Sequence, residues 1–319
     1  MPLPCDGPAT TRMRCGIERL SVIAWAFLAV LAVQAKAQES DKLEIGGATL
    51  NVAFDTTPAP AFRQITLDWI TRAANAVTVY YTVFPVRRVD ITVHVRSGKS
   101  VGHGTASGEG GAHINVTLGS DVSAKALAEG GNNWLMTHEM VHLALSGVEE
   151  SHHWLEEGLA TYVEPIARVR SGELDAHKVW HDMVEGMPNG EPGNGDAGLD
   201  RTPTWGRTYW GGALFCLLAD VEIRKKTNNQ KGLENALRAI VAAGGTIETD
   251  WGITRVLDIG DKAVGAAVLV PLYDRMKDDA HPVDLKSLWL QLGVEENGDT
   301  VVFQDGAPLA AIRKAITQR

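Results

Sequence analysis

Residues 132–164 read NNWLMTHEMVHLALSGVEESHHWLEEGLATYVE, and this stretch decides the expected fold and chemistry of the chain. His138 and His142 are four residues apart, so a helix places both imidazoles on one face, where they can bind one metal ion. Glu139 is rotated from His138 by about 100° and can act as a general base toward a water molecule at that ion. The pattern predicts a zinc site on a helix.

The helix that carries this motif is expected to be buried. Apolar residues fill nearly all the other positions from 134 to 145, including Trp134, and leave almost no polar face. Two histidines and a glutamate inside such a helix would be costly without partners, and a metal ion with its water supplies them. Because the same motif also arises by chance, further ligands are needed to support the site.

A catalytic zinc ion normally has three protein ligands. A histidine six residues after His142, as in metzincins, is excluded because that position is Val148. The candidate in the second helical segment is Glu157, which is followed by small residues that allow two helices to pack closely. His152 and His153 precede this segment and are alternative ligands if the loop folds back.

This second segment resembles the gluzincin metallopeptidases, and among them the aminopeptidase N and peptidase-MA-like groups. Their pattern W-L-x-E-G-x-A-x-Y-x-E is matched by Trp154, Leu155, Glu157, Gly158, Ala160, Tyr162 and Glu164. The resemblance implies that Glu157 is the third zinc ligand and that Glu164 orients a ligating histidine. Two features depart from the family. Glu156, expected as a solvated neighbour, replaces the usual Asn, and the link from His142 to Glu157 is shorter than in aminopeptidase N-type enzymes.

The resemblance also implies roles for residues outside this stretch. Tyr209 opens a predicted helix and is followed by Gly212 and apolar residues, like the tyrosine that donates a hydrogen bond to the oxyanion in aminopeptidase N-like enzymes. A phenol suits this role because it stays protonated at neutral pH. Arg207 is a second candidate for the oxyanion or for a substrate carboxylate. Glu109 resembles the acidic residue with which aminopeptidases hold a free amino terminus.

Residues 1–37 have the pattern of a secretory signal peptide. Basic residues precede an apolar run at 20–33, and small residues at 35 and 37 mark a cleavage site. The run is shorter than the roughly 20 residues that span a bilayer, so we expect cleavage and a periplasmic protein. A retained membrane anchor is the alternative.

The composition after signal removal restricts the partners. Residues 38–319 contain 26 basic and 37 acidic side chains, a net charge of −11, which disfavours nucleic acid and anionic membranes as partners. Cys216 is the single cysteine in this range. An internal disulfide is therefore not expected, and core packing, with help from metal, has to stabilise the fold.

The order of the predicted elements indicates an α+β, zincin-like catalytic domain with two lobes. The upper lobe, residues 38–165, is expected to hold a small mixed sheet and both helices of the metal site. The lower lobe, residues 166–319, is expected to be mainly helical. In the upper lobe we expect a hairpin at 42–54, a helix at 61–81, and strands at 89–95 and 112–118.

The resemblance implies that the last of these strands, residues 112–118, is the sheet edge that pairs with the backbone of a peptide substrate. The glycine-rich residues 97–111 are expected to be a connection. In the lower lobe we expect helices at 165–186, from 209 onward, and at 231–243, 260–277, 282–292 and 307–316, with a long loop at 187–206 and a hairpin at 294–303.

These features predict an exported zinc peptidase with one Zn²⁺ per chain and a peptide or protein as substrate. Whether it removes terminal residues or cuts internal bonds stays open, as does its oligomeric state. The alternative is a non-catalytic periplasmic binding or scaffold protein that zinc stabilises. Glu139 argues against this alternative, because a structural zinc site needs ligands and no general base.

Overall fold

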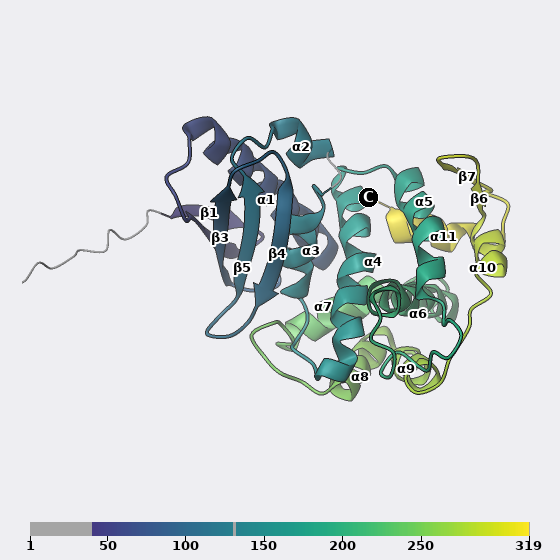
Figure 1. Ribbon diagram of the computed structural model, residues 1–319. Coiled ribbons are helices and arrows are strands. Elements are labelled where there is room, and N and C mark those ends of the chain that lie inside the picture. The colour runs from purple at the N-terminus through teal and green to yellow at the C-terminus, as the bar shows by residue number, and fades with distance from the viewer. Residues whose placement is uncertain (1–39, 130–131, 319) are drawn as a thin grey trace, which may run out of the picture. The chain divides into compact units, whose positions relative to one another are not determined.

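A five-stranded mixed sheet forms the first part of the fold (Figure 1). The computed structural model describes residues 40–129 and 132–318, and the predicted signal peptide at 1–37 lies outside these ranges. The strands are β1 (Asp41–Ile45), β2 (Ala48–Phe54), β3 (Arg88–Arg96), β4 (Val101–Ser107) and β5 (His113–Gly119). Their spatial order is β1-β2-β3-β5-β4, with β2, β3 and β5 parallel to one another and β1 and β4 antiparallel to their neighbours.

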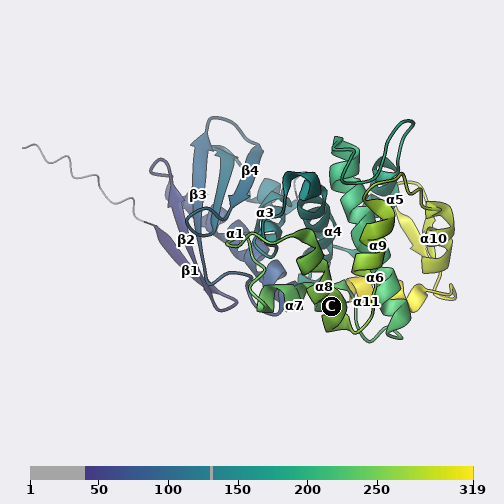
Figure 2. The same cartoon turned by 90° about the horizontal axis from the view of Figure 1, so that it is seen from below.

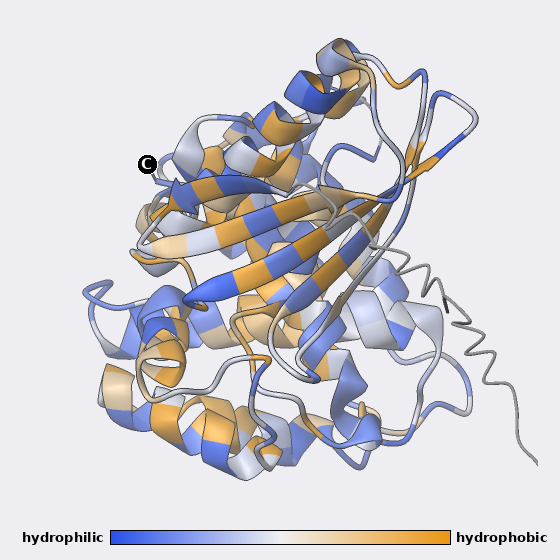
Figure 3. Cartoon of the chain, turned by 90° about the vertical axis from the view of Figure 1, so that its left-hand side faces the viewer, coloured by the Kyte–Doolittle hydropathy of each residue, from blue (hydrophilic) through white to orange (hydrophobic). Residues whose placement is uncertain are grey.

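Strict alternation of buried and accessible residues explains why β2 and β5 form strands here. In β2 every second residue, from Ala48 to Phe54, is buried. The same alternation appears along the sheet as bands of opposite hydropathy (Figure 3). One face therefore packs against helices and the other meets solvent.

The expected edge strand at 112–118 is wrong. β5 lies inside the sheet, between β3 and β4, and β4 is the edge next to it. β4 falls in the glycine-rich stretch that we expected to be a connection. Its sequence, VGHGTAS, lacks apolar alternation, and its pairing with β5 is irregular between Val101 and Gly104. A strand with so few apolar residues gives no period-2 signal.

Helix α1 and the two helices of the predicted metal site form the next layer. α1 (Pro60–Tyr81) begins with a proline in its first turn, where the missing N–H is not needed. α3 (Leu135–His142) contacts β4 and α1, and α4 (His153–Ser171) contacts α1, α3 and α6. Figures 1 and 2 show α4 between the sheet and helices α5, α6 and α9. α4 is thus the central helix of the fold.

The remaining helices and strands include the short helix at 124–129, which contacts α1 on the sheet side of α4, and elements that lie mostly on the other side of α4 (Figure 1). They are α2 (Ala124–Glu129), η1 (Glu150–His152), α5 (Ala176–Gly186), η2 (Met187–Gly190), the π-helical turn η3 (Gly206–Gly211), α6 (Gly212–Lys226), α7 (Leu233–Ala242), α8 (Ile253–Val264), α9 (Leu269–Met276), α10 (Leu285–Leu292), β6 (Val294–Glu296), β7 (Val301–Phe303) and α11 (Ala310–Thr317). The α+β class with a small mixed sheet is confirmed. Within the described residues, no helix is both long and apolar enough to cross a membrane.

Two predicted helices are each two helices in the structure. The helix expected at 165–186 is wrong because α4 continues through Pro165 to Ser171 and ends at Gly172, whose φ is 91°. The helix expected at 260–277 is divided between α8 and α9 by Gly265, with a φ of 74°. Residues with positive φ end helices, and tertiary packing of the buried α4 outweighs the cost of its internal proline. The predicted lobe boundary at residue 165 falls within α4.

Candidate active site

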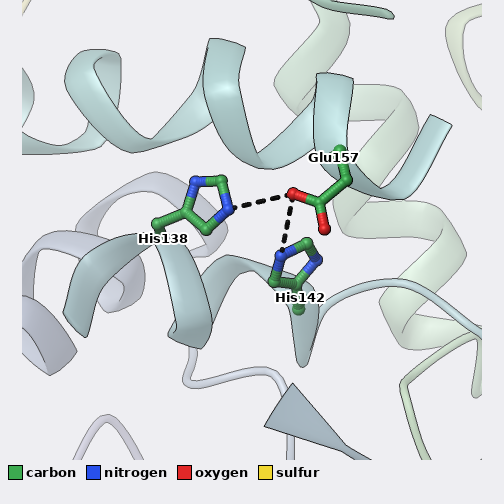
Figure 4. Close-up of side chains that lie close together, drawn as sticks. All are labelled: His138, His142 and Glu157. Atoms are coloured by element: carbon green, nitrogen blue, oxygen red, sulfur yellow. Dashed lines mark hydrogen bonds and ion pairs between the residues drawn. The ribbon is translucent and has the colours of Figure 1, made fainter. Parts of the chain in front are cut away.

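Helices α3 and α4 bring the three predicted metal ligands together (Figure 4). One ligand atom of each of His138, His142 and Glu157 lies within 4.8 Å of the others. Glu157 Oε2 is 3.2 Å from His138 Nε2 and 3.6 Å from His142 Nε2. Two imidazole nitrogens and a carboxylate oxygen are the donor set of a His₂Glu zinc site, so these residues fit a zinc ion.

The surroundings favour the protonation states that bind a metal. Burial, with a contribution from His138, lowers the pKa of His142 to about 4, so this imidazole is neutral and has a free lone pair at pH 7. Burial opposes ionisation of Glu157, but its hydrogen bond with His138 holds the pKa of Glu157 below its usual value. Metal ligands must be deprotonated, and both groups meet this condition.

Glu139 lies beside this group and faces the edge strand. All of α3 from Leu135 to Val141 is buried, as expected, whereas Trp134 at its start is 36% exposed. A Cβ atom on Gly104 of β4 would lie 2.7 Å from Glu139 Oε1, so a glycine is required opposite this carboxyl. Burial, reinforced by Glu157 and opposed by His138, raises the pKa of Glu139 to about 7. A carboxyl with this pKa is suited to exchange a proton near neutral pH.

Tyr209 lies beside His138, on the π-helical turn η3. Its ring is nearly parallel to the imidazole of His138, with centroids 6.5 Å apart. Burial and the negative charge of Glu157 raise the pKa of Tyr209, so its hydroxyl remains a donor at neutral pH. π-Helical turns are frequent at functional sites. Arg207, the second oxyanion candidate, instead is buried, donates a hydrogen bond to Gly190 O and does not line the cleft.

The candidate ligands and Glu139 line a cleft with a volume of about 590 Å³. β4 forms one wall, and Trp134 and Tyr209 line it near the metal ligands. The loop 244–252, between α7 and α8, contributes Ile247, Glu248 and Asp250. No sequence pattern indicated this loop, because its approach depends on contacts between segments far apart in the chain.

Backbone contacts fix the loop 244–252 at the end of β4. Ile247 N donates to Leu143 O over 3.2 Å, and Gly147 N donates to Thr249 O over 2.8 Å. A Cβ atom on Gly108, just after β4, would lie 1.7 Å from Ile247 O, so the two backbones touch there. The loop therefore bridges from the end of β4 to the segment after α3.

The two histidines named as alternative ligands have different positions. His152 is buried and lies 3.1 Å from the Tyr273 hydroxyl and 3.4 Å from Asp200 Oδ2, outside the metal-ligand group. His152 as a ligand is therefore wrong. His153 lies at the cleft, with Nε2 3.5 Å from the second oxygen of Glu157 and Nδ1 2.9 Å from Glu156.

The remaining acidic candidates lie in different surroundings. Glu156 and the exposed Glu109 line the cleft. Glu164 is buried and accepts a hydrogen bond of 2.9 Å from Arg168 on its own helix. Burial raises the pKa of Glu164, and Arg168 and then His138 oppose this rise, so Glu164 also interacts with a predicted metal ligand. Its role in orienting a ligating histidine stays a prediction.

Comparison with known proteins gives a match in structure alone. Neither a protein-family model nor a curated protein matches the sequence. A crystal structure of an aminopeptidase N family protein from Idiomarina loihiensis matches 81% of this chain with a TM-score of 0.61 and 15% identity. This chain shares the fold of that protein. The resemblance that the motifs carried is thus confirmed at the level of the fold.

The matched region is part of a larger protein. The chain spans 49% of the length of the Idiomarina protein. An M1 zinc metallopeptidase from Deinococcus radiodurans matches 77% of this chain and 52% of its own, with 15% identity and a TM-score of 0.48.

Proposed function

We propose that the protein is a zinc-dependent peptidase that binds one zinc ion through His138, His142 and Glu157. The observation that carries this proposal is the convergence of these three donors, which line an open cleft together with Glu139. A structural zinc site is normally closed by four protein ligands, whereas a catalytic site keeps a position open. The fold supports the same function.

The residues around the metal divide the chemistry of peptide hydrolysis between them. A bound zinc ion supplies Lewis-acid polarisation and makes water more acidic. Glu139 accepts the proton of the attacking water and returns it to the leaving amine. The Tyr209 hydroxyl donates a hydrogen bond to the carbonyl oxygen as negative charge develops on it. Both groups lie near His138.

The edge strand β4 is suited to hold the substrate backbone. It is paired with β5 on one side, and several of its residues line the cleft. An edge strand has unpaired N–H and C=O groups that bind an extended peptide by strand addition, largely independently of sequence. We assign to β4 the role that the sequence analysis gave to residues 112–118.

The closed end of the cleft favours an aminopeptidase over an endopeptidase. The loop 244–252 touches Gly108, so a peptide lying along β4 meets this loop at the strand's end. Glu109, Glu248 and Asp250 also line the cleft, and no lysine or arginine is among the described residues that line it. Carboxylates without a nearby cation suit an ammonium group better than a carboxylate.

A single substitution tests the hydrolytic function. Glu139→Gln should retain stoichiometric zinc but lose about 10²- to 10⁴-fold in kcat, because the amide cannot accept a proton. Zinc content and digestion of a peptide library would be measured for both proteins. Glu296→Gln, at an exposed position on β6, is the matched control. If the wild type holds zinc but digests no peptide that Glu139→Gln leaves intact, the non-catalytic binding or scaffold function is favoured instead.

Export is a separate proposal. We infer a cleaved signal peptide and a periplasmic location from residues 1–37, on the sequence pattern alone.

A further inference from the structure

Two tryptophans beside the candidate active site are partly in solvent. Trp134 is 36% exposed and Trp205 is 65% exposed, whereas Trp154 and Trp180 are buried. Among the described large apolar side chains that are exposed, these two are the aromatic ones. A tryptophan that is two-thirds exposed contributes little to the core, so packing does not account for Trp205.

Both tryptophans contact residues of the site. The Trp134 ring meets His138 edge-on, with centroids 5.3 Å apart and planes at 76°. The Trp205 ring lies nearly parallel to Tyr209, with centroids 6.1 Å apart and planes at 28°. Since Tyr209 is itself nearly parallel to His138, the rings Trp134, His138, Tyr209 and Trp205 form one aromatic row.

Three members of the aromatic row, Trp134, His138 and Tyr209, line the cleft. Trp205 is not among the described residues that line it, but it lies against Tyr209 and is mostly in solvent. Glu248 and Asp250 belong to the loop at the end of the cleft. The cleft therefore combines an aromatic surface with an acidic end.

We propose that the aromatic row binds an aromatic side chain of the peptide substrate, next to the bond that is cut. This inference rests on the proposed peptidase function and adds the class of side chain that the cleft selects. The Trp205 ring is 65% exposed and lies nearly parallel to Tyr209 at the cleft, so it favours an aromatic guest over an aliphatic one of similar size, because offset stacking adds to the burial of apolar area. Trp205 is the specificity-determining residue of this row.

Binding to the inactive Glu139→Gln protein tests the inference without cleavage. Titration calorimetry would compare three peptides with a free amino terminus that differ at one position, Phe, Leu or Ala. The Phe peptide should bind about tenfold more tightly than the Ala peptide, within the range of aromatic pair energies. Adding Trp205→Ala should remove most of this difference and change the affinity for the Ala peptide less than about twofold.

Two further variants control for indirect effects. Leu290→Ala removes a side chain that is also 65% exposed but lies on α10, and should leave all affinities unchanged. Trp205→Phe keeps a ring and should keep the preference for Phe, which protects the test if Trp205→Ala fails to fold. Equal affinities of the Trp205→Ala and parent proteins for the Phe peptide would overturn the inference, as would a lack of binding of any peptide.

Turnover by the otherwise wild-type protein separates this inference from the peptidase proposal. If peptides are cut with no preference for Phe, and Trp205→Ala changes nothing, the aromatic subsite is wrong and the peptidase stands. If nothing is cut but binding of the Phe peptide depends on Trp205, the peptidase proposal fails and the subsite stands.

Discussion

Glu157 is the residue whose position most constrains the candidate metal site. Both of its oxygens face histidines, Oε2 toward His138 at 3.2 Å and Oε1 toward His153 at 3.5 Å. Loss of a residue that only supports a metal ligand typically costs 10- to 100-fold in affinity. We therefore expect Glu157→Ala to weaken zinc binding by at least about 100-fold, measured by competition with a chelator.

The neighbouring Glu156 provides the control for this prediction. It lines the cleft but is outside the metal-ligand group, so Glu156→Ala should keep the wild-type zinc affinity. Unchanged zinc affinity in Glu157→Ala would show that the third ligand is wrong. His153 would then be the next residue to test, since it lines the cleft and its Nε2 lies 3.5 Å from Glu157 Oε1.

Substitution of Tyr209 is expected to lower the rate of hydrolysis and to leave metal binding unchanged. Tyr209→Phe removes the hydroxyl but keeps the ring that packs against His138. We expect kcat to fall by about 10²- to 10³-fold, the usual loss when one oxyanion donor is removed, with zinc content and KM nearly unchanged. Steady-state kinetics on one peptide would measure both. A loss confined to KM would indicate a binding role instead.

At the residue scale, the spacing of residues within a helix was the most reliable guide to the relative positions of the site residues. His138, Glu139 and His142 needed nothing but the 3.6-residue period to be placed correctly relative to one another. Arg207 could not be placed in this way, because its contact with the Gly190 carbonyl depends on the path of the chain outside the motif.

At the scale of elements, a contact between two glycines sets the position of Tyr209 relative to Glu157. A Cβ atom on Gly158 of α4 would lie 2.2 Å from Gly212 Cα, at the start of α6. Glu157 is adjacent to the first glycine, and Tyr209 lies three residues before the second. We expect Gly158→Ala to separate these elements, destabilise the fold by about 1–3 kcal/mol and lower kcat.

Urea unfolding monitored by circular dichroism, together with kinetics, would measure both effects of Gly158→Ala. Gly306→Ala is the control, because Gly306 lies between β7 and α11, is not among the described residues that line the cleft, has no positive φ and has no atom within 4 Å of a built Cβ. If Gly158→Ala and Gly306→Ala are equally stable and active, the close helix contact does not position the site.

Periodic patterns of apolar residues decide which elements could be predicted from the sequence. β2 and α1 were found because their apolar residues repeat with a period of 2 or 3.6. β4 was missed because Gly104 is required by its neighbour Glu139, which leaves no apolar alternation to recognise. The expected start of a new helix at Pro165 was wrong for a related reason. Burial against other elements stabilises that helix, and a local signal does not contain those contacts.

At the scale of the whole molecule, the cleft joins segments that are far apart in the sequence. Gly108 follows β4, Gly147 follows α3, and Ile247 lies in the loop that contacts both. Each segment alone has the pattern of a turn, so their contact could not be predicted from the sequence. The closed end of the cleft is a property of the assembled fold.

This closed end leads to a prediction about the substrate terminus. Acetylating the amino terminus of a peptide removes the positive charge that Glu109, Glu248 and Asp250 would attract. A hydrogen bond to a charged group is worth about 1.5–3 kcal/mol, so kcat/KM should fall by roughly 10- to 100-fold. Amidation of the carboxyl terminus, the matched control, should change kcat/KM less than about twofold because that end extends away from the loop.

The double variant Glu248→Gln/Asp250→Asn assigns this effect to the loop. It should reduce the difference between free and acetylated peptides, chiefly by raising KM for the free peptide, because the carboxylates would bind the ammonium group of the substrate and take no part in proton transfer. The positions of the cuts would be read by mass spectrometry. Internal cuts in acetylated peptides, at the rate seen with free peptides, would mean that substrate passes the loop 244–252 and that the enzyme is an endopeptidase.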